Sequence, residues 1–248
     1  MAASLELVLS LLKHSLKVLV VDDDERVLDM VTGYLEMCSL FDVTPVKTVD
    51  EARTLAARQA WHCWLADLYV PELDDGLNLM RDYARAIPMI VLSGRSTGSD
   101  GYRCGELSIL GFIDKTEIRG PALVERVYQI CLYKTMCTRY PYIVTCGRRD
   151  EEPLKVLELR RPESVAEWAS MLSVSSRTLE QWAGECSAYK PSTMLALFHL
   201  YRIAFARSML RRHELAELSE REQAIVDRYA ERPARLRSLI ARTVQSHQ

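Results

Sequence analysis

The chain has 248 residues, of which 48% are hydrophobic and 27% are charged, and its formal net charge is −2. That length suits one large domain or two smaller ones, each with enough apolar residues for a core. No run approaches the roughly 20 apolar residues that a membrane-spanning helix needs, and the seven scattered cysteines form no CxxC pair. These features argue against a membrane protein, a disulfide framework and a thiolate zinc site, and they favour a reducing cytoplasm.

The first predicted element lies in an N-terminal extension, residues 1–16. Its apolar stretch, residues 5–12, is short, has no basic leader before it and has no small-residue cleavage site after it. We therefore expect an extra helix or strand in front of the sheet, and not a signal peptide.

Residues 17–138 alternate strand and helix patterns five times. The short apolar runs are rich in β-branched residues, as buried parallel strands are, and the segments between them are amphipathic. This alternation predicts a doubly wound parallel α/β sheet with helices on both faces. The fourth helix contains three glycines and is expected to be short or irregular. The predicted strands are 17–21, 43–47, 62–66, 88–92 and 110–114, and the predicted helices are 25–38, 49–60, 76–86, 98–107 and 120–138.

Polar residues stand at the C-terminal ends of four predicted strands. Asp22 and Asp23 follow the first strand, Asp67 follows the third, Ser93 follows the fourth, and Lys115 follows the fifth. These side chains should converge, because ligands of an open parallel sheet bind at the edge where its strands end. Three carboxylates repel each other unless a cation neutralises them, and an oxygen-rich site of this kind suits Mg²⁺.

A phosphoryl-transfer site is the chemistry that this arrangement favours. A carboxylate oxygen of Asp67 would attack phosphorus and give an aspartyl phosphate. The nearby lysine and hydroxyl group could stabilise the phosphoryl oxygens. The alternative is that the acids simply cap strand ends and helix starts.

Residues 17–137 resemble the receiver domain of two-component response regulators, which has a five-stranded flavodoxin-like fold. The resemblance rests on residues in matching order and strand context: Asp22, Asp23, Asp67, Pro71, Ser93, Phe112 and Lys115. It implies that Asp67 accepts phosphate from a sensor histidine kinase. It also implies that Asp23, Asp67 and the backbone carbonyl of Tyr69 hold Mg²⁺, with Asp22 helping through water.

The same resemblance assigns the remaining residues to a conformational switch. Lys115 would pair with the acyl phosphate, Ser93 would move to hydrogen-bond it, and Phe112 would be the aromatic side chain that changes rotamer. Activation would then lead to a homodimer.

Three positions depart from the pattern of that family. One extra residue separates Asp67 from Gly76, and Ser93-Gly94 replaces a threonine-alanine pair. Thr116 stands where the family usually has proline, so a cis peptide bond is not expected there. None of these changes removes a reactive group, and we expect the site to be competent for phosphorylation.

The pattern changes after the predicted sheet. Residues 139–162 are rich in breakers and charge and are interpreted as a linker with a short strand at 154–159. Helical patterns resume over 163–248, the predicted output domain. From residue 155 onward there are roughly 15 Lys and Arg against 11 Asp and Glu, a mild basic excess that permits nucleic-acid binding.

Residues 164–186 have the pattern of a helix-turn-helix. Ser164 and Glu167 form a capping box, a three-residue turn follows the first helix, and the second helix buries an apolar face around Leu179. An arginine can read guanine and a glutamine can read adenine, while hydroxyl groups and a lysine can contact phosphates. The predicted DNA contacts are Ser176, Arg177, Thr178, Gln181 and Lys190.

This segment resembles the first helix-turn-helix of AraC-type regulators. The match consists of residues 174–179, Lys190-Pro191, Arg202-Ile203 and the apolar positions after them. The second helix-turn-helix of that family is not visible after Leu210, because the helix that opens at Ser219 continues through Pro233 without a recognition helix. The resemblance implies a half-size DNA-binding output, which would dimerise to be specific.

Two other functions stay open. The output could be a helical bundle that binds a protein partner, or the receiver could be a scaffold that works without phosphate. The apolar stripes at 215–229 and 236–240 are interpreted as internal core, as are His62 and His199. No catalytic arrangement of Ser, His, Asp or Cys is present, so an enzyme is not expected. The sequence thus predicts a cytoplasmic, phosphorylation-regulated response regulator that binds DNA and controls transcription.

Overall fold

The computed structural model describes residues 2–71, 73–94, 107, 109–137, 153–209 and 217–245. The chain divides into two compact units. The sheet unit consists of His14–Lys134, and the helical unit consists of Met1–Lys13 together with Thr135–Ser246. The segment before the sheet therefore belongs to the same unit as the C-terminal helices. None of the helices that the structure describes is long and apolar enough to cross a membrane.

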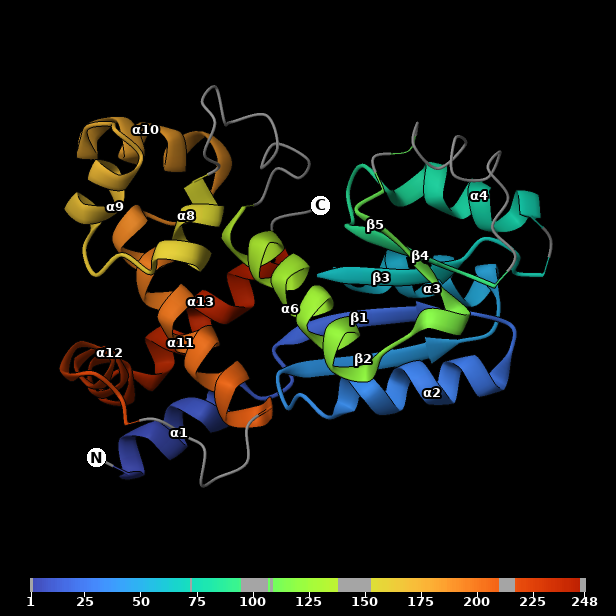
Figure 1. Cartoon of the computed structure of the whole chain (residues 1–248), viewed down its shortest axis with the longest axis horizontal. Coiled ribbons are helices and arrows are strands. Elements are labelled where there is room, and N and C mark those ends of the chain that lie inside the picture. The colour runs from blue at the N-terminus through green and yellow to red at the C-terminus, as the bar shows by residue number, and fades with distance from the viewer. Residues whose placement is uncertain are drawn as a thin grey trace. The chain divides into compact units, whose positions relative to one another are not determined.

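The sheet unit contains five parallel strands in the order β2-β1-β3-β4-β5 (Figure 1). This order places β1 and β3 in the middle, where both faces of a strand are covered, and their side chains are almost fully buried. The predicted fold class is confirmed. The strands are β1 (Leu16–Val21), β2 (Phe41–Val46), β3 (Cys63–Asp67), β4 (Met89–Ser93) and β5 (Gly111–Asp114).

Helices cover both faces of this sheet (Figure 1). On one face α2 and α6 lie close enough for Tyr34 to touch Gly120, and on the other face α3 packs against α4. The helix predicted at 98–107 lies outside the described residues. The helices are α2 (Glu25–Glu36), α3 (Val49–Arg58), α4 (Leu73–Tyr83) and α6 (Gly120–Met136), with a short 3-10 helix η1 (Lys115–Glu117).

The helices begin where side chains cap them. Asp24 accepts the backbone N–H of Arg26 at the start of α2, and Thr48 forms a reciprocal capping box with Glu51 at the start of α3. Such caps satisfy backbone donors that the first helical turn leaves unpaired, and each contributes about 1 kcal/mol. The turn after β1 is therefore fixed by Asp24, immediately beside the two acids of the candidate site.

His62 is a core residue, as predicted. Its side chain is 1% exposed, and its Nδ1 accepts the backbone N–H of Lys17 at 2.9 Å. The ring thus satisfies a donor on β1 just before the strand that carries Asp67.

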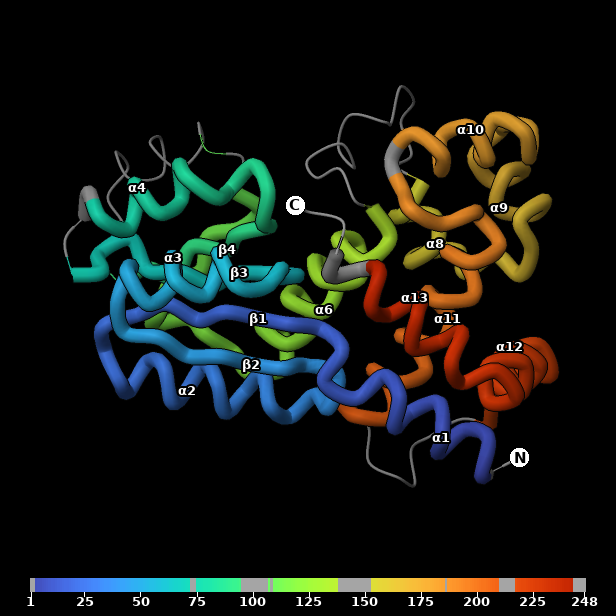
Figure 2. Tube along the Cα trace, turned by 180° about the vertical axis from the view of Figure 1, so that it is seen from behind, coloured from blue at the N-terminus to red at the C-terminus, as the bar shows by residue number. Residues whose placement is uncertain are grey.

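The helical unit combines both ends of the chain. Helix α1 (Ala2–Leu12) packs against α11 (Pro191–Met209), α12 (Glu220–Ala230) and α13 (Pro233–Gln245), and Figures 1 and 2 both show it beside them. Most of α11 is buried, which makes it the centre of the unit. The prediction that the apolar stripes are internal core is confirmed for the buried residues Ile225, Val226, Tyr229, Leu236 and Leu239. Leu218 and Ile240 are half-buried, and Leu215 lies outside the described residues.

The strand predicted at 154–159 is wrong, because this segment forms helix α8 (Pro153–Arg160). Proline is favourable at the first position of a helix, where no backbone N–H is needed. Leu154 and Leu157, three residues apart, are buried on one side of the helix, whereas Leu159 is 70% exposed. This segment is mostly apolar, which is compatible with a short strand, but its apolar and polar residues do not alternate strictly. Leu154 and Leu157 share one side only at the spacing of a helix.

Candidate functional site

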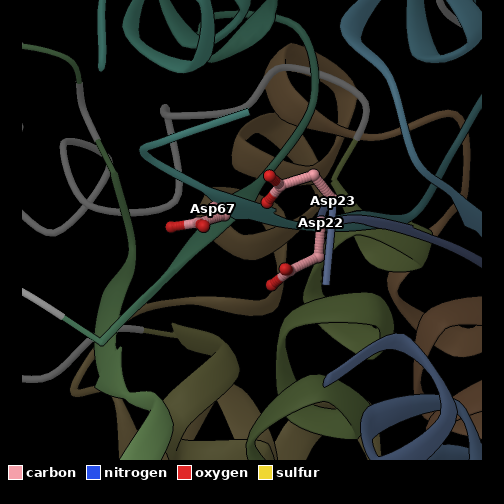
Figure 3. A group of neighbouring side chains, drawn as sticks. All are labelled: Asp22, Asp23 and Asp67. Atoms are coloured by element: carbon pink, nitrogen blue, oxygen red, sulfur yellow. The ribbon is translucent and has the colours of Figure 1, made fainter. Parts of the chain in front are cut away.

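The ends of β1 and β3 bring three aspartates together, as Figure 3 shows. Asp22 and Asp23 directly follow β1, and Asp67 is the last residue of β3. One carboxylate oxygen from each lies within 4.8 Å of the others. The convergence follows from the parallel register, in which Val21 pairs with Ala66 one residue before these acids.

Lys115 neutralises two of these acids. Its Nζ lies 2.7 Å from Oδ2 of Asp22 and 2.7 Å from Oδ2 of Asp67. Burial opposes the charged form of this lysine, but its hydrogen bonds to Asp22 and Asp67 outweigh that effect and raise its pKa. Lys115 is thus held as a cation at the point where the acids meet.

Asp22 is the most buried of the three acids, with 0% of its surface exposed. Burial raises its pKa above the ordinary value, because the charged form loses its hydration, and the hydrogen bond from Lys115 offsets only part of this shift. Its Oδ1 accepts the backbone N–H of Asp24 at 3.0 Å. A second cation near Asp22 would therefore stabilise the charged form of its carboxylate, which burial disfavours.

The donor set fits Mg²⁺. Among the described residues, Oδ1 of Asp67 is buried without a hydrogen-bond partner, although Oδ2 of the same carboxylate is paired. Asp23 is exposed to solvent, and Tyr69 is half-buried two residues beyond Asp67. Carboxylate and carbonyl oxygens with water access are the ligands that Mg²⁺ prefers. Asp23, Asp67 and the backbone carbonyl of Tyr69 could hold the ion, with Asp22 at its outer side.

Ser93 lies on β4, which is next to β3, and Phe112 lies on β5, the edge strand beyond β4. Leu92 pairs with Asp67, so Ser93 stands one residue further along the same edge of the sheet, and it is fully buried. Phe112 pairs with Val91, and its side chain is 39% exposed. The hydroxyl group is thus positioned near the acids, while the aromatic ring is accessible to solvent.

Thr116 has a local structural role at the position where the resemblance would place proline. Its backbone N–H and its hydroxyl group donate to Oδ1 of Asp114 at 2.8 and 2.6 Å, and these bonds lower the pKa of Asp114. Proline has no N–H and could not make the first of these bonds. Within the described part of the chain Val70–Pro71 has the cis peptide bond, so the bond after Lys115 is trans, as expected.

Gly76 is a residue whose importance the sequence did not reveal. A Cβ atom on Gly76 would lie 2.2 Å from the carbonyl oxygen of Leu68 and 2.7 Å from that of Asp67. Helix α4 can therefore approach the end of β3 this closely only with glycine here. The signal in the sequence was a glycine at the start of a helix, which by itself does not show what backbone it faces.

The segment predicted as a helix-turn-helix forms two helices, α9 (Val165–Met171) and α10 (Ser176–Cys186), which pack against each other. Trp168 and Trp182 meet edge to face at 6.2 Å, and Leu179 is buried. The capping box at Ser164 is incomplete, because the Glu167 carboxylate accepts the N–H of Glu163 instead. All five predicted DNA contacts are exposed: Ser176, Arg177, Thr178, Gln181 and Lys190.

Comparison with known proteins identifies one of the two units. Residues 18–128 match the family model of the response regulator receiver domain, so this part of the chain is a receiver domain. The match does not extend into the helical unit, and the AraC-type resemblance stays a prediction. No curated protein matches the chain.

Solved structures similar to the chain are also receivers. A response regulator from Thermotoga maritima is 25% identical with a TM-score of 0.42, covering 47% of this chain and 97% of that one. A CheY-like receiver domain protein from Methanospirillum hungatei is 19% identical with a TM-score of 0.43, covering 47% and 93%. The signal receiver domain of a signal transduction histidine kinase from Syntrophus aciditrophicus is 24% identical with a TM-score of 0.42, covering 46% and 89%.

Proposed function

We propose that this protein is a phosphorylation-regulated response regulator whose helical unit binds DNA and controls transcription. The observation that carries the proposal is the cluster of Asp22, Asp23 and Asp67 with Lys115 inside a receiver domain. The protein would act as a switch, and not as an enzyme with a substrate of its own.

Phosphoryl transfer would take place on Asp67. A carboxylate oxygen of Asp67 forms a bond to phosphorus while the phosphorus–nitrogen bond of a phosphohistidine on the kinase breaks, and the released imidazole keeps the electron pair and takes a proton. Bound Mg²⁺ would neutralise phosphoryl oxygens during this step. Lys115 already contacts Oδ2 of Asp67 and would pair with the new acyl phosphate.

The switch would then pass from Asp67 through β4, the neighbouring strand, to β5 at the edge of the sheet. Ser93 is buried at the end of β4, where its hydroxyl group can turn toward a phosphoryl oxygen. Phe112 on β5 is exposed enough to change its rotamer without displacing core residues. This change would favour a homodimer, which places two helical units on adjacent half-sites of DNA.

Direct contact with bases would come from α10. Arg177 and Gln181 are exposed on one side of this helix, whereas Leu179 and Ala183 are buried on the other. Arginine to guanine and glutamine to adenine are the pairs that the major groove supports.

The proposal is tested by selecting binders from a pool of random duplex oligonucleotides at a stated salt concentration. The full chain is used with Mg²⁺, with and without beryllofluoride as a phosphoryl analogue. Enrichment of one motif that strengthens with beryllofluoride, and that Arg177→Ala and Gln181→Ala abolish, is the expected result. No enrichment in either state would refute sequence-specific DNA binding and, with it, control of transcription through α10.

A protein partner is the second candidate for the helical unit. Helix α10 carries Glu180 and Glu185 in addition to Arg177, so its exposed side is acidic overall, which is unfavourable beside phosphates. A receiver that works without phosphate is the third candidate. It would show the same output in Asp67→Asn as in the unchanged protein.

A further inference from the structure

Helix α13 and the end of α12 carry a concentration of positive charge that no role above explains. From residue 228 to residue 245 there are five arginines and one acidic residue, Glu231. All five arginines are exposed, and among the described residues none of them makes an ion pair or a hydrogen bond through its side chain. The arginines are Arg228, Arg232, Arg235, Arg237 and Arg242.

The arginines of α13 lie on the side that faces away from the helical unit. Leu236 and Leu239 are buried on the opposite side, which packs against α12 and α1. At 3.6 residues per turn, Arg237 lies at one border of the exposed side, and Arg235 and Arg242 lie at the other. Between these borders stand small residues, which would let a ligand approach the helix closely: Ala234, Ser238 and Ala241.

The chemistry of this surface selects a polyanion. Guanidinium groups bind phosphate through paired N–H donors and stay charged at every physiological pH. Unpaired arginines so close together repel one another, and binding to a phosphate backbone neutralises their charge. The binding also releases the counterions that had surrounded the phosphates, which favours the complex.

Among polyanions, the surface fits duplex DNA best. An anionic membrane surface would need apolar side chains on the exposed side of the helix, but the leucines of α13 are used inside the unit. Single-stranded nucleic acid would need exposed aromatic rings for stacking, and the aromatic residue of this region, Tyr229, is 4% exposed. The major groove of duplex DNA admits an α-helix, and arginines at both borders of its exposed side would face the phosphates that flank the groove.

We propose that α13 and the end of α12 form a second DNA-binding surface, in which Arg235, Arg237 and Arg242 bind the phosphate backbone of duplex DNA. The inference rests on the proposed function, since it assumes that the helical unit binds DNA. It assigns affinity to α13, whereas sequence preference stays with α10.

The test compares the full chain with a variant in which Arg235, Arg237 and Arg242 are replaced by glutamine. Binding to a random-sequence duplex of about 30 base pairs, roughly three helical turns, is measured over a range of salt concentrations. We expect the affinity at low salt to fall at least about tenfold, and the slope of log K against log salt to become shallower by about 2 to 3. The variant should keep its thermal midpoint, because these three exposed side chains make no ion pair or hydrogen bond in the part of the chain that the structure describes.

A control with the same charge change separates this surface from a general effect of net charge. Arg58, Arg81 and Arg85 are exposed on the receiver domain, and their replacement by glutamine should leave the salt slope unchanged. Equal losses in the control and the α13 variant would overturn the inference.

Two further outcomes distinguish the inference from the function on which it rests. If the unchanged protein binds no duplex at any salt concentration, the proposed function fails and the inference fails with it. If the protein binds duplex and the α13 variant binds it equally well, the inference alone fails. Loss of binding to phosphatidylserine vesicles with no loss of duplex binding would show instead that α13 serves a membrane surface.

Discussion

The two units of this protein position their functional residues by different means. In the sheet unit, parallel strands end at one edge, so residues that are 45 positions apart in the chain, such as Asp22 and Asp67, must meet. The described part of the helical unit consists of helices without strands, and each helix presents its own exposed side to the surroundings. A site that needs several side chains in one place can therefore be predicted from the residues at strand ends. A binding surface on a helix depends on which side of the helix the packing leaves exposed.

The largest effect is expected for phosphorylation at Asp67, where the ends of β1 and β3 meet. Asp67→Asn should abolish incorporation of a phosphoryl group from acetyl phosphate in the presence of Mg²⁺, because the attacking carboxylate is gone. Intact mass spectrometry measures the incorporation. Asp42→Asn, on exposed β2, is the matched control and should be labelled like the unchanged protein. Undiminished labelling of Asp67→Asn would assign the acceptor to another residue.

The next largest effect tests whether α1, which is separated in sequence from the other helices, is part of the helical unit. Val8 is 1% exposed within α1, which packs on α11, α12 and α13. Val8→Asp buries an uncompensated charge and should destabilise this unit by about 3 to 5 kcal/mol. Hydrogen exchange should then accelerate in α12 and α13, but not in β1 and β3.

Leu7→Asp is the control for that experiment, because Leu7 is 37% exposed and a charge there stays in water. If Val8→Asp accelerated exchange in the strands as much as in α12 and α13, the assignment of α1 to the helical unit would be refuted.

A smaller effect is expected where α4 meets the end of β3. Gly76→Ala forces a Cβ atom into the backbone of Asp67 and Leu68 and should cost about 3 kcal/mol of unfolding free energy. Gly33→Ala, in α2, meets no atom within 4 Å and should instead stabilise the protein by about 0.5 to 1 kcal/mol. Denaturant unfolding measures both. Similar changes in the two variants would contradict the close approach at Gly76.

The pH dependence of stability should reveal the buried charge of Asp22. Its pKa is raised in the folded protein above the ordinary value of 3.8, so between the ordinary and the raised value the folded state binds more protons than the unfolded state. This contribution to stability is present at low pH and is lost as the pH rises through the folded pKa.

In the absence of Mg²⁺, the stability of the unchanged protein relative to Asp22→Asn should therefore fall as the pH rises above about 4, with a slope of at most about 1.4 kcal/mol per pH unit. Urea titrations over that pH range give the difference. A relative stability that rises over the same range would mean that Lys115 dominates the balance.

The smallest effects on stability are expected from the loss of a helix cap, and they should be equal in the two units. Thr48 caps α3 in the sheet unit, and Ser219 caps α12 in the helical unit, each in a complete capping box. Replacement of either by alanine should cost about 1 kcal/mol, because the same backbone donors lose their acceptor. Thermal unfolding measures both variants. A clear difference between them would show that tertiary packing, and not the cap, determines where these helices begin.

The fold of the sheet unit could be predicted from its sequence because its strands are short, apolar and bounded by polar residues. The positions of Asp22, Asp67, Ser93 and Lys115 followed from the same pattern. The double ion pair of Lys115 could not be predicted, since a lysine side chain can reach several partners from one backbone position. The close approach at Gly76 also depends on a backbone that lies nearby only after folding.

The helical unit was harder to predict for a physical reason. The apolar residues between Leu154 and Leu159 are compatible with a strand or a helix, and Pro153 favours the start of a helix. The helix after Pro233 was not expected to serve recognition, yet its arginines remain exposed and unpaired once the leucines are buried. The sequence did show that residues after Glu231 include arginines and no acidic residue. Only the packing of α13 shows on which side of the helix these arginines lie.

Helix α1 sets the order in which the chain can complete its folding during synthesis. Its partner α12 begins at Glu220, about 200 residues after the end of α1, which is roughly 10 to 40 s at ribosomal rates. Residues 14–134 are a continuous segment and can fold in that interval. The apolar side of α1 around Val8 meanwhile lacks its contacts with α12 and α13, so the helical unit can reach its final form only after these two helices have been made.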